Sequence, residues 1–285
     1  DGTGVRVCVV DTGIDTSHSA LDDQNVVFRD FIGRSTEPID RGATAHGTMM
    51  SGLLVSDGHQ QGAVPGITLG VAAALSGDSD GENTGDDAIV AEAIDWCREE
   101  FDADLVSLSL GGERMEGQRD VVVSSVRRAL DAGVFVVAAA GNDGGAEDDG
   151  RVASPAFLPR VISVGATNET GAVWENSSRG DGMGDAPNQK PEVTAPGVNV
   201  ISTGANDDWF SSSGTSVSTV LVSGALAMIL EAHPELKVDD DRCIVHVKHA
   251  LREALGGPHD PQSGYGELDA MAWFEAVDPT CPAAL

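Results

Sequence analysis

Short runs of β-branched and other apolar residues alternate with segments of helical periodicity, and this alternation limits the fold more than any other feature. Each run is short enough to form one buried strand. The strands are predicted at residues 5–10, 69–75, 105–108, 134–138 and 161–164. Alternating strands and helices favour a parallel sheet, because right-handed connections place helices on both faces. We therefore predict an α/β fold with a doubly wound, mainly parallel sheet.

Helical periodicity fills the stretches between these strands. Apolar residues recur three and four positions apart over 87–97 and 119–130, which is the spacing of an amphipathic helix. Small and apolar residues dominate 215–231, which predicts a buried helix, and 238–254 is predicted to be a more exposed one. Loops are expected where Gly and Asp concentrate, at 76–87, 142–151 and 179–190. Because no repeat or linker interrupts the pattern, residues 1–285 are predicted to form one domain.

The excess of acidic residues argues against negatively charged binding partners. Acidic residues outnumber basic ones by 46 to 17, which gives a net charge of −29. A chain of this size has a folded surface of roughly 11,000 Å², or about one net negative charge per 400 Å². Phosphate binding needs a basic stripe, so neither nucleic acid nor an anionic membrane is an expected partner. The acidity predicts either a very soluble monomer or adaptation to high salt, where screening removes the self-repulsion.

Composition and length point to a folded globular protein. Hydrophobic residues make up 41% of the chain and charged residues 22%, which excludes disorder over its whole length. The longest apolar run, residues 220–230, is broken by Ser223 and Gly224 and is shorter than the roughly 18 residues of a membrane span. No signal peptide opens the chain. We expect an extracellular protein from which a leader has been removed, with an intracellular location as the alternative.

The cysteines leave the redox compartment open. Cys8, Cys97, Cys243 and Cys281 are widely spaced, without the CxxC pattern of a metal site. Four cysteines allow three disulfide pairings, and spacing does not choose among them. Cys8 lies inside an apolar strand pattern, so we expect a buried free thiol there.

Three polar residues stand at the start or end of predicted elements. Asp11 follows the first strand in VVDTGID, His46 begins a small-residue helix in AHGTMMSG, and Ser216 begins the buried helix in SGTSVSTVLVSG. Each has a structural explanation, as a turn aspartate, a helix-start histidine and an N-capping serine. However, Asp, His and Ser in this order along an α/β chain also match the order of the subtilisin catalytic triad.

A fourth residue and several longer blocks extend the match. Asn142 follows a buried strand in VVAAAGND, where it is either a turn residue or a donor to an oxyanion. With this block the chain resembles the subtilisin-like serine proteases over nearly its whole length. Further blocks match in the family's order: SLSLGG (107–112), ASPAFLPRVISVGAT (153–167), TAPGVNVIST (194–203) and GYGELDA (264–270).

The resemblance implies a role for each catalytic candidate. Ser216 would be the nucleophile, and His46 would take its proton and later give it to the leaving amine. Asp11 would hold the imidazole and stabilise its charged form. The side chain of Asn142 and the backbone N–H of Ser216 would bind the oxyanion. Since His46 must be unprotonated to act as a base, activity is expected near neutral or mildly alkaline pH.

The same resemblance implies how substrate binds. An extended peptide would add a strand against residues 109–111, and small residues on two neighbouring segments would wall an S1 pocket that takes a large apolar P1 side chain. Asp143 at the rim would disfavour acidic P1 groups. The substrate-binding residues implied are Ser109, Leu110, Gly111, Ala139, Gly141 and Ser154.

Three positions depart from the family pattern. Val220 replaces a usual proline, and Met49 replaces the second histidine of HGTH. Ala20 stands where the family's SHPDL segment has a calcium-binding aspartate, which argues against that calcium site. No cofactor is implied. An acidic loop with Asp78, Asp80, Glu82, Asp86 and Asp87 is a weaker calcium candidate that lacks the final glutamate of a calcium loop.

Several functions remain open at this point. The leading hypothesis is a serine endopeptidase of moderate or broad specificity that acts on protein or peptide chains, with an inhibitory prosegment as a further expected partner. A dedicated maturation protease for one propeptide or leader is the alternative enzyme. A pseudoprotease that only binds a partner is opposed by the complete set of catalytic candidates. A nucleotide-binding protein is opposed by the lack of GxGxxG or GxxxxGK[ST] after any predicted strand.

Overall fold

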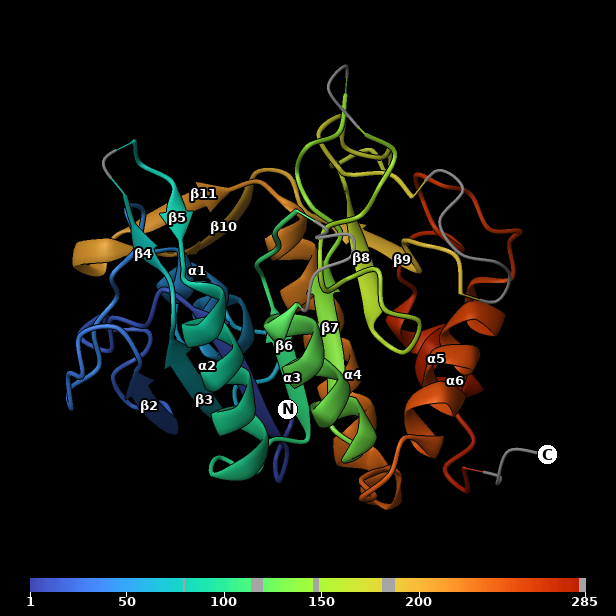
Figure 1. The fold of residues 1–285 in the computed structure, drawn as a ribbon, viewed down its shortest axis with the longest axis horizontal. Helices are drawn as coiled ribbons and strands as arrows, with labels where there is room; N and C mark the ends of the chain where they lie inside the picture. The colour runs from blue at the N-terminus through green and yellow to red at the C-terminus, as the bar shows by residue number, and fades with distance from the viewer. Residues whose placement is uncertain (79, 114–119, 146–148, 181–187, 282–285) are drawn as a thin grey trace.

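A seven-stranded parallel sheet forms the centre of the computed structural model (Figure 1). The structure describes all residues except 79, 114–119, 146–148, 181–187 and 282–285. The strands lie in the order β2-β3-β1-β6-β7-β8-β9. Their bounds are β1 Arg6–Asp11, β2 Val26–Asp30, β3 Thr68–Ala73, β6 Leu105–Leu108, β7 Phe135–Ala139, β8 Ile162–Thr167 and β9 Val193–Pro196.

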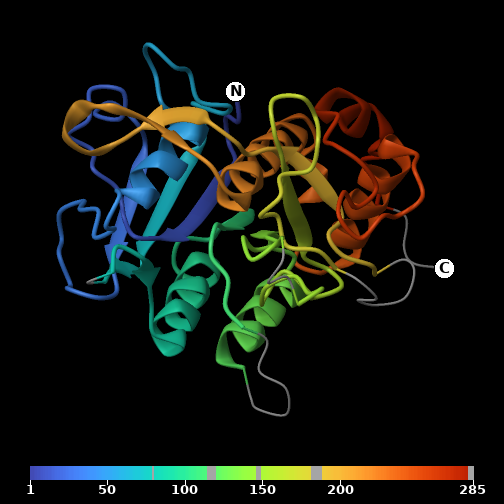
Figure 2. The ribbon, with the colours of Figure 1, turned by 90° about the horizontal axis from the view of Figure 1, so that it is seen from above.

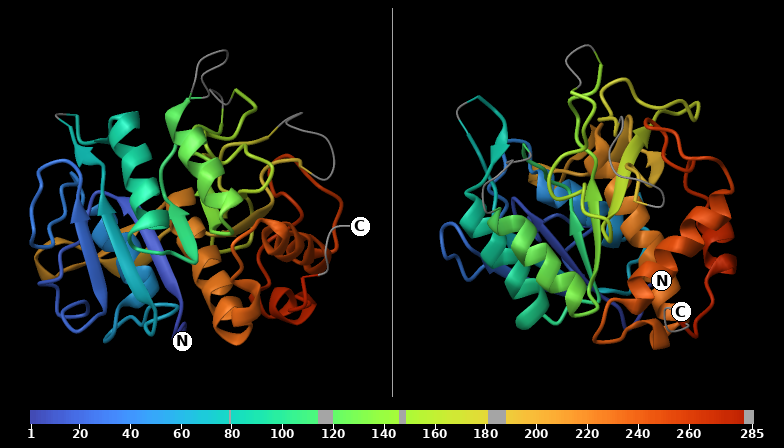
Figure 3. Two further views of the ribbon diagram at one scale, coloured as in Figure 1. Left: turned by 60° about the horizontal axis from the view of Figure 1, so that its bottom comes forward. Right: turned by 45° about the vertical axis from the view of Figure 1, so that its right-hand side comes forward.

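Helices cover both faces of the sheet, as the sequence predicts (Figure 2). One face carries α2 (Asp87–Glu99) and α3 (Val121–Asp131), which pack against each other. The other face carries α1 (His46–Val55) and α4 (Thr215–Ala232). The helices α5 (Arg242–Leu255) and α6 (Ala270–Ala276) pack together beyond β9 (Figure 3). The fold class is therefore confirmed.

Smaller elements complete the architecture. Two short antiparallel pairs join β4 (Ser76–Gly77) to β5 (Asn83–Thr84) and β10 (Val200–Thr203) to β11 (Trp209–Ser212). Two 3₁₀ turns are η1 (Ala205–Asp207) and η2 (Pro234–Leu236). The pair of β4 and β5 lies in a segment predicted to be a loop. The helix α5 begins at Arg242, four residues after the predicted start at residue 238, because η2 and a turn precede it.

The helix α4 is the central core helix. It is long and apolar enough to cross a membrane by length and composition, but 72% of it is buried inside the protein. It packs on β6, β7, β8 and β9 and against α1. This burial explains why its sequence is apolar on all sides rather than along one stripe.

The prediction of a free thiol at Cys8 is wrong, because Cys8 forms a disulfide with Cys97. The apolar strand pattern correctly indicated that Cys8 is buried, but not that α2 packs over β1 with Cys97 on its inner side. The two Cα atoms are 5.8 Å apart, a separation that a disulfide spans. A second disulfide joins Cys243 of α5 to Cys281 near the C-terminus.

Candidate active site

The carboxyl ends of three central strands bring the predicted site residues to one edge of the sheet. Asp11 is the last residue of β1, Ser109 follows β6, and Asn142 lies three residues beyond β7. Parallel pairing of β1 with β6 and of β6 with β7 aligns these ends. The chain order reverses beside β1, since β3 lies on one side of it and β6 on the other. Open parallel sheets bind ligands at such a switch point.

Asp11 and His46 form a direct hydrogen-bonded pair in the site. The imidazole Nδ1 lies 2.7 Å from Oδ1 and 2.9 Å from Oδ2 of Asp11. Asp11 is fully buried, whereas 18% of the His46 side chain is exposed. An ionised carboxylate accepts hydrogen bonds only, so Nδ1 carries the proton in neutral His46. The other ring nitrogen, Nε2, is then free to accept a proton.

This pairing raises the pKa of His46 above its ordinary value of 6.5. Burial by itself would lower the pKa, because it disfavours the charged imidazole. The charge of Asp11 and its hydrogen bond oppose burial, and the charge of Asp40 adds to them. The site therefore favours the protonated form of His46. A general base needs this property, because it must hold a proton during the reaction.

Ser216 lies in the first turn of α4, but its hydroxyl does not point to His46. It donates to the backbone oxygen of Ser109 over 3.2 Å, and the Ser109 hydroxyl donates to the backbone oxygen of Ser216 over 3.0 Å. No hydrogen bond joins Ser216 to His46 in the described part of the chain. The structure thus pairs Asp11 with His46 directly, and the Ser216 hydroxyl is hydrogen-bonded to Ser109 instead.

Asn142 is oriented by Thr215, a residue that the sequence analysis did not single out. Its Oδ1 accepts from the backbone N–H and from the hydroxyl of Thr215, both over 2.9 Å. A Cβ atom placed on Gly214 would lie 3.4 Å from Nδ2 of Asn142 and 3.8 Å from the backbone N of Ser216. Because glycine has no side chain, the space between these two donors stays open. Two donors beside an open space are the arrangement that an oxyanion requires.

The predicted substrate-binding segments also come together. Gly112, which follows Ser109, Leu110 and Gly111, exchanges two backbone hydrogen bonds with Ser154 over 3.1 and 3.0 Å. The neighbouring Ala153 donates to Ala140 over 2.7 Å, which connects this segment to Ala139 and Gly141. Ser154 itself is buried, and its hydroxyl donates to Asp120, the N-cap of α3. The N–H, the carbonyl and the hydroxyl of Ser154 are therefore all hydrogen-bonded within the protein.

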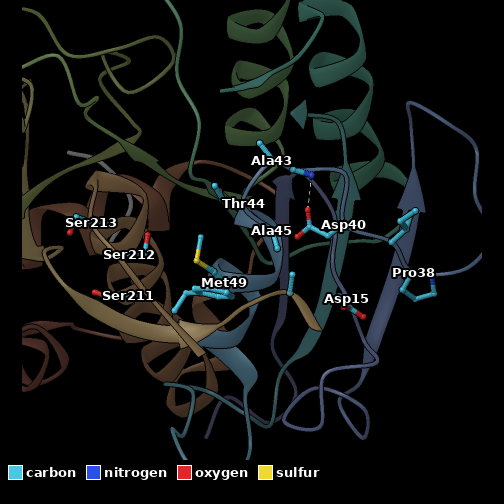
Figure 4. Close-up of a pocket in the computed structure, with 14 residues that line it drawn as sticks. Asp15, Pro38, Asp40, Ala43, Thr44, Ala45, Met49, Ser211, Ser212 and Ser213 are labelled. Atoms are coloured by element: carbon cyan, nitrogen blue, oxygen red, sulfur yellow. Dashed lines mark hydrogen bonds between the residues drawn. The ribbon is translucent and has the colours of Figure 1, made fainter. Parts of the chain in front are cut away.

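A cavity of about 800 Å³ lies beside His46 (Figure 4). One wall is residues 38–40 and 42–45 with Met49, and the facing wall is Ala205 with residues 210–213. Two acids, Asp15 and Asp40, are among its 14 lining residues, and no basic residue is. The walls adjoin the catalytic candidates, since Ala45 precedes His46 and Ser213 lies three residues before Ser216.

Comparison with known proteins gives the family. The model of the subtilase family, Peptidase_S8, matches residues 2–267. This chain belongs to the subtilase family. It is 32% identical over 274 residues to serine protease AprX of Bacillus subtilis, with 84% of this chain and 60% of that protein covered. It is also 32% identical to subtilisin E of Bacillus subtilis over 236 residues, covering 82% of this chain and 57% of that protein.

Solved structures agree on the fold of this subtilase. The structure of the prenylagaramide maturation protease PagA superposes with a TM-score of 0.76 at 23% identity, covering 96% of this chain and 94% of that one. The self-cleaved protease domain of PatA superposes with a TM-score of 0.72 at 22% identity, covering 95% of each chain. At these identities the likeness supports the fold alone.

The calcium positions considered from the sequence do not fit a cation well. Subtilases often bind calcium, but the side chain of Ala20 is buried and supplies no ligand. In the acidic loop, Oδ1 of Asp78 accepts from the backbone N–H groups of Asp80 and Glu82 over 2.9 and 3.0 Å, so the loop itself uses one of the two oxygens of that carboxylate. Over the residues that the structure describes, no three His, Cys, Asp or Glu side chains gather as a metal site.

Proposed function

We propose that this subtilase is a serine endopeptidase that cleaves protein or peptide chains through an acyl-enzyme. The observation that carries the proposal is the Asp11–His46 pair, held at 2.7 Å on the edge of the sheet where Ser216 and Asn142 also lie. Asp11 fixes the proton on Nδ1, which leaves Nε2 of His46 as the base. Rotation of the Ser216 hydroxyl away from the Ser109 oxygen would bring the nucleophile to that base.

The chemistry then follows from the geometry. Nε2 of His46 takes the proton of the Ser216 hydroxyl as Oγ bonds to the substrate carbonyl carbon. The carbonyl oxygen becomes an oxyanion, which accepts from Nδ2 of Asn142 and the backbone N–H of Ser216. When this intermediate collapses, the peptide C–N bond breaks and His46 gives its proton to the leaving amine. Water repeats the sequence on the acyl-enzyme and releases the second product.

The substrate side chain before the scissile bond is proposed to be large and apolar. Ala139, Ala140 and Ala156 are buried small residues on the two segments that meet beside Asn142. Small side chains on these segments would leave room for a bulky P1 group and would offer it no charge. Acidic P1 groups would be disfavoured, because Asp143 lies next to Asn142 on a strongly acidic molecule.

The cavity beside His46 is proposed to hold the leaving-group side of the substrate. Residues 109–111 would bind the substrate residues that precede the scissile bond. The substrate residues that follow the scissile bond would then lie on the other side of Ser216. Met49 and Phe210 supply apolar walls there, while Asp15 and Asp40 would disfavour acidic residues. This arrangement predicts that cleavage requires few specific contacts and has moderate to broad specificity.

An oxidising, extracellular location is proposed as well. Two disulfides form within one domain, and such bonds persist outside the cytosol. An inhibitory prosegment that covers the same cleft fits such a protease.

A quenched fluorescent peptide library tests the function. We expect cleavage after large apolar residues, and we expect Ser216→Ala to lower kcat about 10⁶-fold, the size of effect known for subtilisin. Ser124→Ala, which removes a hydroxyl from the outer helix α3, serves as the matched control and should keep full activity. An equally active Ser216→Ala variant would contradict the proposal.

A further inference from the structure

The helix that carries His46 begins without an ordinary N-cap. The residue before His46, Ala45, is in the left-handed conformation at φ 53° and offers no side-chain acceptor. The first turn of α1 also contains no acidic residue to balance the helix dipole. Backbone N–H groups at the start of a helix need acceptors from elsewhere when they are buried, as those of Gly47 and Thr48 are.

Asp40 supplies what the helix start lacks. Its Oδ2 accepts from the backbone N–H of Thr48 over 2.8 Å and from the Thr48 hydroxyl over 2.6 Å. Its Oδ1 accepts from the hydroxyl of Thr12 over 2.7 Å and from the backbone N–H of Gly42 over 2.8 Å. The carboxylate of Asp40 thus acts as a helix cap from six residues upstream of His46.

The same carboxylate reaches the strand that carries Asp11. Thr12 follows Asp11, and its backbone N–H donates to Oδ1 of Asp11 over 2.7 Å. The Thr12 hydroxyl, which donates to Asp40, accepts in turn from the backbone N–H of Gly47 over 2.8 Å. Asp40 and Thr12 together therefore join the end of β1 to the start of α1, the two points that hold Asp11 and His46.

We propose that Asp40 is a positioning residue of this active site, which holds Asp11 and His46 in register and supplies a second negative charge for the imidazolium. This inference rests on the proposed peptidase function. Asp40 exchanges no proton and forms no bond with substrate. Its effect on the chemical step comes through the placement and the charge balance of His46, apart from the charge that it adds to the wall of the cavity.

The charges around His46 agree with this role. Burial lowers the pKa of His46, whereas Asp11 and, more weakly, Asp40 raise it. The nearest cation to Asp40 in sequence, Arg41, is turned to Asp30 and bonds to it over 2.6 Å. Asp15 lines the same cavity and adds negative charge. The charge of Asp40 is thus left uncompensated by Arg41.

The variant Asp40→Asn tests the proposal, because it keeps the shape of the side chain and removes its charge. We expect kcat to fall roughly 10- to 100-fold, as for a small displacement of a catalytic group, with KM little changed. The acid limb of the pH profile of kcat/KM should move to lower pH. Asp86→Asn is the matched control, because Asp86 caps α2 by accepting from the backbone N–H of Ala88. This variant should leave kcat and the pH profile of kcat/KM unchanged.

A measurement that needs no turnover separates this inference from the proposed function. In the Ser216→Ala background, the imidazole pKa of His46 can be followed by NMR, with the signal assigned by its loss in a His46→Gln variant. Asp40→Asn should lower that pKa, whereas Thr48→Val, which loses the hydroxyl contact but keeps the charge, should not. If Asp40→Asn is folded yet leaves both the NMR pKa and kcat unchanged, Asp40 is only a helix cap and the proposal is overturned.

Discussion

The imidazole of His46 lies between opposing influences, and their balance determines the pH at which the site works. Burial is the largest single influence and lowers its pKa, whereas the charge and the hydrogen bond of Asp11 at 2.7 Å, together with the charge of Asp40, raise it above its ordinary value. A neutral hydrogen-bond acceptor in place of Asp11 would lack the charge that helps to offset burial. Asp11 therefore orients the ring and also keeps it basic enough to take a proton from a serine hydroxyl.

The first prediction concerns this pKa. The unprotonated imidazole is the base, so kcat/KM should rise with pH through the pKa of free His46, and the midpoint of that limb should lie above 6.5. The free energy of unfolding should depend on pH in the opposite direction. The raised pKa of His46 stabilises the folded state below pH 6.5, and this contribution is lost as the pH rises through the pKa of His46 in the folded state. A pH profile measured with a small peptide ester checks the limb. A midpoint below 6.5 would contradict this account of the charge balance.

Motif order supplies the four proposed site residues, whereas their contacts appear only in the folded structure. Motif order located Asp11, His46, Ser216 and Asn142 at element ends, and the structure places all four on one edge of the sheet. Asp40 was missed because its role depends on Thr12 and Thr48, which reach it only after folding. The one signal for Asp40 in the sequence was a carboxylate shortly before a helix whose N-terminus has no capping side chain.

Among the elements, buried ones were the easiest to predict. The strand at 105–108 and the helix at 215–231 match β6 and α4 within a residue, since continuous apolar runs mark fully buried segments. The strands β2 and β9 were missed. The edge strand β2 is half exposed, and β9, with the sequence VTAP, contains Thr194 and Pro196 and so lacks a continuous apolar run. The helix α6 was missed as well, because its seven residues are too few to show a period.

A buried charge cluster joins the elements at the far end of the sheet. Glu192, just before β9, is fully buried and accepts from Lys190 over 3.0 Å and from Ser163 N over 2.8 Å. Lys248 of α5 lies 2.5 Å from its other oxygen. Burial would raise the pKa of Glu192, but the two lysines hold it below its ordinary value.

The second prediction is that Glu192→Gln destabilises the fold strongly. The change leaves buried lysines around a neutral amide, and removing one partner of a buried ion pair costs about 3–5 kcal/mol. Urea unfolding of Glu192→Gln against the wild-type chain measures the loss. Glu235→Gln, at an exposed glutamate of η2, is the control and should change the free energy of unfolding little. A loss below about 1 kcal/mol would show that the lysines are discharged in the folded state.

At the scale of the whole molecule, net charge is the dominant property. The chain carries a net charge of −29, and its solvent-accessible surface is 12086 Å². Salt shortens the range of repulsion, from about 10 Å at 0.1 M to about 3 Å at 1 M. We propose that the folded state gains stability over this range, as in a protein adapted to high salt.

The third prediction follows from that charge. The thermal unfolding midpoint should rise as NaCl increases from 0.1 to 1 M, because screening relieves repulsion in the compact state more than in the expanded one. Sucrose, which favours folding without screening charge, is the control for general solute effects. Adding a chelator at each salt concentration tests calcium separately, and we expect no change. A midpoint that is independent of NaCl would remove the proposed salt adaptation.

The central claim is that Ser216 is a nucleophile activated by His46 and Asp11. A fluorophosphonate probe followed by peptide mapping measures this reactivity directly. We predict a single label on Ser216 in the folded wild-type chain, lost in Ser216→Ala and slowed greatly in His46→Ala. A folded wild-type chain that takes no label, or a label on another serine, would contradict the account.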